Sequence, residues 1–180
     1  MAHAAPFFVG SRLKEYRHQT TSARSCLNFF VMKNSKFAIR VASDGDVSIL
    51  ARLAAQLGYP VDAAEMGARY ARVRAARVGE VFVAEHIADE QVVGWTHVVP
   101  RLQLEDAPFA ELAGLVVDDA VRGAGVGAVL LKAAEMWARS EGFATMRVRS
   151  NVVRERAHRF YEREGYERIK AQAVFRKDLK

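Results

Sequence analysis

Three glycines lie within five positions, at Gly123, Gly125 and Gly127, where a turn opens onto a segment with helical periodicity. Glycine adopts positive φ without steric cost and leaves the neighbouring backbone N–H groups uncovered. Such amides at the start of a helix, together with the helix dipole, favour an anion such as a phosphate. The segment from Arg122 to Gly127 therefore predicts a phosphate-binding loop, with a simple tight turn as the alternative.

Two common kinds of phosphate-binding site, for dinucleotides and for nucleoside triphosphates, do not fit this loop and the segments around it. It satisfies the dinucleotide pattern G-x-G-x-x-A, but five residues separate Val117, the end of the preceding predicted strand, from Gly123. In the dinucleotide fold that strand runs directly into the first glycine, and an acidic residue follows about 20 positions later. Here the next predicted strand ends at Arg149-Ser150-Asn151, and no Lys-Ser or Lys-Thr pair follows Gly127. The sequence therefore indicates another kind of phosphate-bearing ligand.

Two segments carry a resemblance to a known family. Residues 122–127 fit R/Q-x-x-G-x-G/A, the acetyl-CoA motif of the GCN5-related N-acetyltransferases, the GNAT family. The run from Asn151 to Tyr161, followed by Gly165-Tyr166, resembles the second stretch of that family, N-x-x-A-x-x-F-Y-x-x-x-G-F/Y, with Asn151 offset. The resemblance covers residues 37–180 and rests on two motifs in the correct order and spacing.

This resemblance implies an α/β GNAT-like fold: a twisted mixed sheet flanked by helices and splayed between its fourth and fifth strands. Acetyl-CoA would lie in the split as the co-substrate, and no metal is implied. The strand backbone at 115–117 would meet the pantetheine amides, and the glycine loop would hold the pyrophosphate. The implied co-substrate residues are Leu115, Val116, Val117, Arg122, Gly123, Ala124, Gly125, Val126, Gly127 and Asn151.

Acetyl transfer to an amine needs a base and a hydrogen-bond donor. A primary amine with a pKa near ~10.4 is protonated at neutral pH, so a base must remove a proton before the amine attacks the thioester. Glu111 is the predicted base, because it opens an apolar strand where partial burial would raise its pKa. Glu105, Asp106 and His97 are the alternatives. By resemblance, Tyr161 is the general acid, predicted to stabilise the departing thiolate.

Hydrophobic periodicity predicts the elements that position these residues. Alternating apolar residues predict strands, and apolar residues three and four apart predict helices. Gly114 is the expected site of a β-bulge. The predicted strands cover 37–41, 80–85, 92–99, 109–117, 144–150 and 173–179, and the predicted helices cover 44–58, 62–77, 126–141 and 154–164.

Length and charge predict one domain with a basic extension. The 180 residues suit a single core, and the formal net charge is +6. Residues 1–36 hold six basic residues and one acid, so they carry +5 of that charge. They are expected to be a flexible extension, of transit-peptide type or from an early start site, before an acetyltransferase domain at 37–180. Because that domain is nearly neutral, nucleic acid is not an expected partner.

Composition also bears on location. No apolar run approaches the ~20 residues that cross a bilayer, so no membrane association is expected. The single cysteine, Cys26, cannot form an internal disulfide, which favours a reducing cytoplasm.

The sequence thus predicts direct transfer of the acetyl group of acetyl-CoA to a primary amine, with a small-molecule acceptor favoured. Direct attack is expected because Ser150 has no evident His and Asp partners, and Cys26 lies outside the predicted domain. A non-catalytic acyl-CoA sensor of the same fold is the main alternative, and Tyr161 argues for the enzyme. A nucleic-acid-binding protein that acts through its basic extension is a second alternative. A homodimer is left open.

Overall fold

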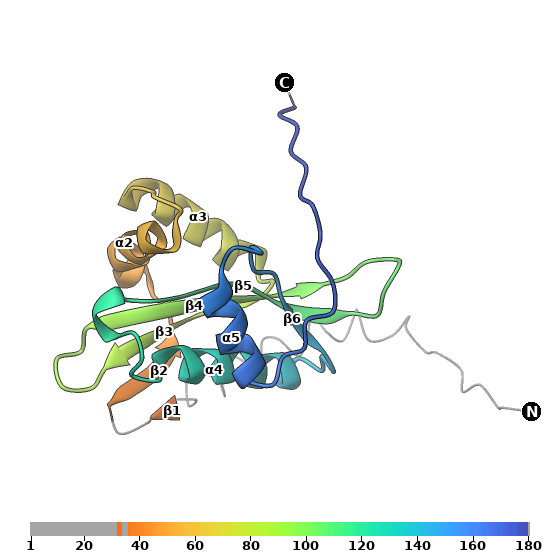
Figure 1. Ribbon diagram of the computed structural model, residues 1–180. Helices are drawn as coiled ribbons and strands as arrows, with labels where there is room; N and C mark the ends of the chain where they lie inside the picture. Colours follow the sequence, from red (N-terminus) through yellow and green to blue (C-terminus); the bar gives the residue numbers. More distant parts are fainter. Residues whose placement is uncertain (1–31, 34–35, 180) are drawn as a thin grey trace, which may run out of the picture.

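A mixed β-sheet forms the centre of the protein (Figure 1). The computed structural model describes residues 32–33 and 36–179. The strands pair in the order β1-β2-β3-β4-β5-β6, and all neighbours are antiparallel except β5 and β6, which are parallel. The strands are β1 Met32–Lys33, β2 Phe37–Val41, β3 Glu80–His86, β4 Val92–Arg101, β5 Phe109–Val117 and β6 Met146–Val148.

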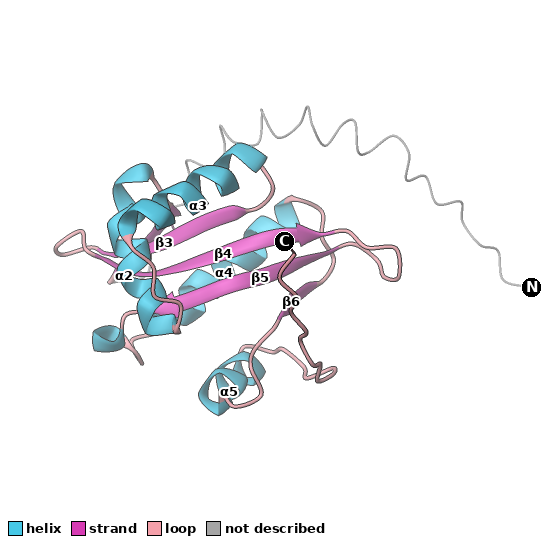
Figure 2. Ribbon diagram, turned by 90° about the horizontal axis from the view of Figure 1, so that it is seen from above, coloured by secondary structure: helices cyan, strands magenta, loops and turns pink. Residues whose placement is uncertain are grey.

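Helices cover both faces of this sheet, which confirms the predicted fold class. Helices α2 and α3 lie over one face and α4 lies under the other, while α5 stands beside the β5 and β6 side (Figure 2). The helices are α2 Val47–Leu57, α3 Ala63–Ala76, α4 Val126–Ser140 and α5 Glu155–Arg163, with short 3₁₀ turns η1 Asp44–Asp46 and η2 Asp119–Val121.

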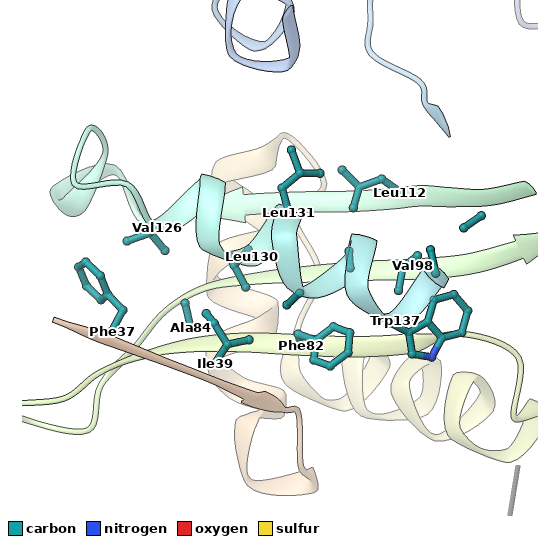
Figure 3. Packing of buried hydrophobic residues seen from close by; sticks show 14 of the residues in the cluster. Phe37, Ile39, Phe82, Ala84, Val98, Leu112, Val126, Leu130, Leu131 and Trp137 are labelled. Carbon is teal, nitrogen blue, oxygen red and sulfur yellow. The ribbon is translucent and has the colours of Figure 1, made fainter. Parts of the chain in front are cut away.

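Two hydrophobic layers hold the helices on the sheet. The larger layer packs the apolar face of α4, including Leu130, Leu131 and Trp137, against the strands (Figure 3). The smaller layer packs α2 and α3 against the other face, with Leu53 and Tyr70 among its buried residues. Because side chains alternate along a strand, each central strand supplies residues to both layers.

A β-bulge interrupts β5 at the place that the sequence predicts. His97 on β4 pairs with Gly114, but the next residue, Val98, pairs with Leu112, so Ala113 is the extra residue of β5. A Cβ atom at Gly114 would lie 2.8 Å from the ring of Trp95, so only glycine fits there without displacing that ring. The bulge bends β5, so the second half of the strand runs in a different direction from the first half.

The sheet splits beside this bulge. β6 pairs with β5 only from Ala110 to Leu112, where Leu112 faces Val148. From Ala113 to Val117, the edge of β5 toward β6 has no strand partner among the described residues. This separation confirms the predicted splay between the two strands.

Two features differ from the prediction. Residues 173–179 do not form a strand: from 164 to 179 the described chain contains no helix or strand, and Val174, Phe175 and Leu179 are exposed. Alternating apolar residues form a strand only where a neighbour supplies hydrogen bonds and a buried face, and this segment leads away from the sheet (Figure 1). The predicted strand at 144–150 is also shorter, because only Met146–Val148 pair with β5.

The sheet begins before Phe37. Met32 and Lys33 lie within the predicted extension, yet they pair with Ile39 and Ala38 of β2. The rest of the extension, residues 1–31, lies outside the described residues.

Candidate active site

The glycine loop has the backbone that its sequence requires. Gly123 and Gly125 have φ values of +91° and +86°, in the region that side chains disfavour. No atom of the described residues lies within 4 Å of a Cβ built at either position, so the outer side of the loop is open. Asp118 stabilises the turn that precedes the loop, because its Oδ1 accepts a hydrogen bond from the amide of Ala120 at 3.1 Å.

This loop leaves backbone amides free at the start of α4. Two amides are used within the turn: Arg122 donates to the Asp119 carbonyl at 3.4 Å, and Ala124 donates to the Val121 carbonyl at 3.2 Å. Among the described residues, no other turn hydrogen bond uses an amide of residues 123–127. A helix of 15 residues follows, so its dipole adds to these donors. The loop can therefore hold a phosphate group.

A cavity of about 1030 Å³ joins this loop to the split in the sheet. Its walls come from the second half of β5, the glycine loop, the chain after β6, α5, and the end of α2 with the loop that follows it. Nearly all of the implied co-substrate residues line it: Leu115, Val116, Val117, Arg122, Gly123, Gly125, Val126, Gly127 and Asn151. Ala124 is exposed and is not part of the lining.

Tyr161 lines the same cavity from α5. Its ring packs between Phe160 and Tyr166, with ring centroids 5.1 and 5.8 Å away. Burial raises the pKa of Tyr161 to about 12, so the hydroxyl keeps its proton at neutral pH. Asn151 stabilises the turn before α5, because its Oδ1 accepts a hydrogen bond from the Val153 amide at 3.2 Å.

Glu111 has different surroundings from those predicted. It is 5% exposed and does not line the cavity. Arg101 donates to its Oε2 from one side, and Arg149 bonds both oxygens from the other, at 2.9 and 3.0 Å. Burial alone would raise the pKa of this carboxyl, but the two guanidinium groups outweigh burial and hold the pKa below its usual value. The predicted rise in pKa is therefore wrong.

The alternative bases also differ from one another. Asp106 pairs with Arg147 at 2.6 Å, which lowers its pKa, and Glu105 is exposed in the loop after β4. His97 is largely buried, and its Nε2 has no hydrogen-bond partner among the described residues. Burial, with a smaller effect from the charge of Arg101, lowers the pKa of His97. Its imidazole is therefore neutral at pH 7.

Sequence reasoning missed the basic lining of this cavity. Arginines follow the chain from the end of β6 through α5, and they all face the cavity: Arg149, Arg154, Arg156, Arg159 and Arg163. Four of them occur within the ten residues 154–163, a density that was visible in the sequence. The pairing of Arg149 with Glu111 left no such signal, because 38 residues separate them.

No set of three or more metal-ligating side chains comes together in the part of the chain that the structure describes. Likewise, none of the helices in 36–179 is long and apolar enough to span a membrane.

Comparison with known proteins agrees with this geometry. The profile of the acetyltransferase (GNAT) family matches residues 48–166. The aminoglycoside N(6')-acetyltransferase type 1 of Stenotrophomonas maltophilia is 31% identical over 145 residues, which are 78% of this chain and 93% of that protein. The aminoalkylphosphonate N-acetyltransferase of Salmonella typhimurium is 39% identical over 77 residues, 42% of this chain and half of that protein.

Solved structures share the fold. The 6'-N-acetyltransferase AAC(6')-IG of Acinetobacter haemolyticus matches with a TM-score of 0.69 at 20% identity, over 79% of this chain and 99% of that one. The aminoglycoside N-acetyltransferase AAC(6')-Iy, solved with CoA, matches with a TM-score of 0.72 at 19% identity, over 83% of this chain and 100% of that one. GNAT enzymes use acetyl-CoA as co-substrate. The chain belongs to the acetyltransferase (GNAT) family and is an N-acetyltransferase.

Proposed function

We propose that this enzyme transfers the acetyl group of acetyl-CoA directly to the primary amine of a small molecule. The main support for the proposal is one continuous cavity, which is lined by the open glycine loop and by the side chain of Tyr161. Both curated relatives carry names of enzymes that acetylate small amines, an aminoglycoside and an aminoalkylphosphonate.

The residues of the cavity fit the parts of acetyl-CoA. The free amides of residue 123 and of residues 125–127, at the start of α4, suit the pyrophosphate, and a Cβ built at Gly123 or Gly125 would point into open space. The unpaired edge of β5 from Ala113 to Val117 offers backbone groups to the amides of pantetheine. The thioester that acetyl-CoA supplies would then lie near the bulge at Gly114.

Tyr161 acts in this proposal as a hydrogen-bond donor to the departing sulfur. A pKa of about 12 exceeds that of a free thiol, ~8.5, by about 3.5 units. At 1.36 kcal/mol per unit, complete proton transfer to the thiolate would cost about 5 kcal/mol. A hydrogen bond that strengthens as the sulfur gains charge avoids this cost.

Removal of the amine proton falls to His97 in this proposal, in place of Glu111. Glu111 is ionised and held by two arginines, so its low pKa makes it a weak acceptor. His97 is neutral, its Nε2 has no partner among the described residues, and it pairs in register with Gly114 at the bulge. Like Glu111, His97 does not line the cavity, so its support as the base is its place beside the bulge, its neutral imidazole and its Nε2, unpaired within the described part of the chain.

The experiment is an amine panel that measures free CoA released from acetyl-CoA. The panel includes an aminoglycoside, an aminoalkylphosphonate, a polyamine and amino acids. We expect amine-dependent CoA release, with the acetylated amine identified by mass spectrometry. Calorimetric binding of acetyl-CoA without CoA release for any amine would instead support the acyl-CoA sensor, and failure to bind acetyl-CoA would overturn both.

A further inference from the structure

The charge of the cavity is strongly one-sided. Among the described residues that line it are six arginines and one acid, Glu164, which give a formal charge of +5. A phosphate monoester carries up to about −2 at pH 7, so the three phosphates of CoA bring roughly −4. Three of these arginines also pair with carboxylates outside the lining, Arg122 with Asp119, Arg149 with Glu111 and Arg159 with Glu155, so bound CoA would offset the positive charge that remains.

One part of this positive charge lies away from the phosphate-binding loop. Arg149 is the first residue after β6, and Leu112 with Val148 forms the last pair before the sheet splits. Arg149 therefore stands at the fork between the strands. Of the other arginines in the lining, Arg154 precedes α5, and Arg156, Arg159 and Arg163 lie on that helix.

At the fork, two arginines share one carboxylate. Arg101 and Arg149 both bind Glu111, so the cluster keeps a net charge of +1. The side chain of Glu111 is buried, whereas those of Arg101 and Arg149 are 46% and 66% exposed. Arg149 lines the cavity, whereas Arg101 lies outside the lining, and both side chains keep exposed N–H groups that could bind a second anion. Guanidinium groups bind phosphonate and carboxylate in a bidentate manner.

An unsatisfied hydroxyl belongs to the residue that follows Arg149. Ser150 follows Arg149 in the cavity lining, and its Oγ is fully buried without a hydrogen-bond partner among the described residues. Buried polar groups rarely lack partners, and a bound water, an ion or a ligand group can satisfy one that lines a cavity. A hydroxyl can donate to an anionic oxygen.

The distance from the fork to the bulge sets the size of the acceptor. Glu111 precedes Gly114 by three residues on β5, and strands rise by ~3.3 Å per residue, so the separation is about 7–10 Å. A small molecule with an amine at one end and an anion at the other spans this distance.

We propose that the acceptor is a primary amine that also carries an anionic group, a phosphonate, phosphate or carboxylate, which Arg101 and Arg149 bind at the fork with Ser150. The proposal rests on the proposed acetyl transfer. It separates this chain from enzymes that acetylate polycations.

The test compares two acceptors that share an aminopropyl chain, 3-aminopropylphosphonate, which ends in an anion, and 3-aminopropan-1-ol, which ends in a neutral hydroxyl. We expect kcat/KM for the phosphonate to exceed that for the alcohol by about tenfold or more, mainly through a lower KM. Because this comparison uses the unaltered protein, it does not depend on the folding of any variant. Equal kcat/KM values, or a preference for the alcohol, would overturn the proposal.

Substitutions then locate the anion site. In Arg149→Met and in Arg101→Met, the ratio of kcat/KM for the phosphonate to kcat/KM for the alcohol should fall toward one. The fall should come mainly from a higher KM for the phosphonate. The matched control is Arg139→Gln, an exposed arginine near the end of α4 that pairs with Glu135 and should keep the preference. A preference that survives in both methionine variants would place the anion elsewhere and overturn the assignment.

The outcomes separate this proposal from the proposed function. Acetyl transfer to the alcohol and the phosphonate at equal rates leaves the transferase intact and removes the anion site. Acetyl transfer to aminoglycosides or polyamines alone has the same meaning. Absence of acetyl-CoA binding removes the proposed function itself.

Discussion

At the residue scale, the hydroxyl of Tyr161 can be tested without changing its packing. Tyr161→Phe keeps the ring between Phe160 and Tyr166 and removes only the donor to the leaving sulfur. We expect kcat to fall by about 10²-fold, because a single positioned donor contributes at that level. The Kd of acetyl-CoA, measured by calorimetry, should change by less than about twofold. An unaltered kcat would reject the role.

The identity of the base is a second question at this scale. A base must be deprotonated to act, so kcat/KM should gain a limb that rises with pH through the pKa of the base. The pKa of His97 lies below its usual 6.5, so this limb should appear in the acidic range below 6.5. His97→Gln should lower kcat/KM at pH 7 by about 10²-fold and reduce the slope of log kcat/KM below pH 6.5 by about one.

Glu111 gives the contrasting result. Its pKa is lowered, so as a base it would produce a limb at more acidic pH. Glu111→Gln should leave the limb of His97 in place, whereas loss of that limb in Glu111→Gln would return the base to Glu111. Thermal unfolding of each variant provides the control, because removal of one partner of a buried ion pair destabilises by about 3–5 kcal/mol.

At the scale of elements, the glycine loop can be tested with a matched pair. Gly125 and Gly142 have similar φ values, +86° and +82°, and no described atom lies within 4 Å of a Cβ at either position. Alanine therefore imposes the same backbone cost at both, roughly 1–2 kcal/mol. Only Gly125 lines the cavity.

Gly125→Ala should accordingly weaken acetyl-CoA binding by about tenfold or more, since it both strains and covers the phosphate-binding amides. Gly142→Ala, at the far end of α4, should lose similar stability and keep its affinity. Calorimetry for affinity and urea unfolding for stability give both numbers. Equal affinities in the two variants would contradict the assignment of the loop.

The elements that the sequence predicted well are those with a local signal. The strand at 109–117 and the helix from Val126 follow from apolar spacing, and the loop between them follows from glycine. The last predicted strand failed because its alternation needs a neighbouring strand, which spacing within one segment cannot supply. Local pattern singled out residues 122–127 and the family resemblance singled out Tyr161; the structure brings both to one cavity, and their roles stay predictions.

The lowered pKa of Glu111 could not be predicted from the sequence. Its partners lie 10 residues before it and 38 residues after it, on β4 and after β6. Burial was foreseeable from the apolar strand, but the arginines come together only when the two neighbouring strands take their register. Charge pairs across a sheet depend on that register, and register is not visible in one sequence.

At the scale of the whole molecule, acetyl-CoA would bridge α5 and the rest of the fold, which contact each other through few residues. None of the residues of α5, all of which the structure describes, is buried. The helix contacts the rest through Phe160, whose ring lies 3.4 Å from a Cβ built at Gly127, and through Tyr161. The cavity lies between this helix and β5, so acetyl-CoA would contact both walls.

Binding should therefore stabilise α5 more than the rest of the fold. At 100 times its Kd, a ligand that binds only the folded state adds about 2.7 kcal/mol to the free energy of unfolding. Amide hydrogen exchange resolves where this appears. We expect acetyl-CoA to slow exchange most in α5 and at the start of α4, and least in α3, which lies on the other face of the sheet. Gly125→Ala should reduce this protection at a fixed ligand concentration, and Gly142→Ala should preserve it. Protection confined to α3 would show that the ligand binds outside the split, because α3 contributes no residue to the cavity lining.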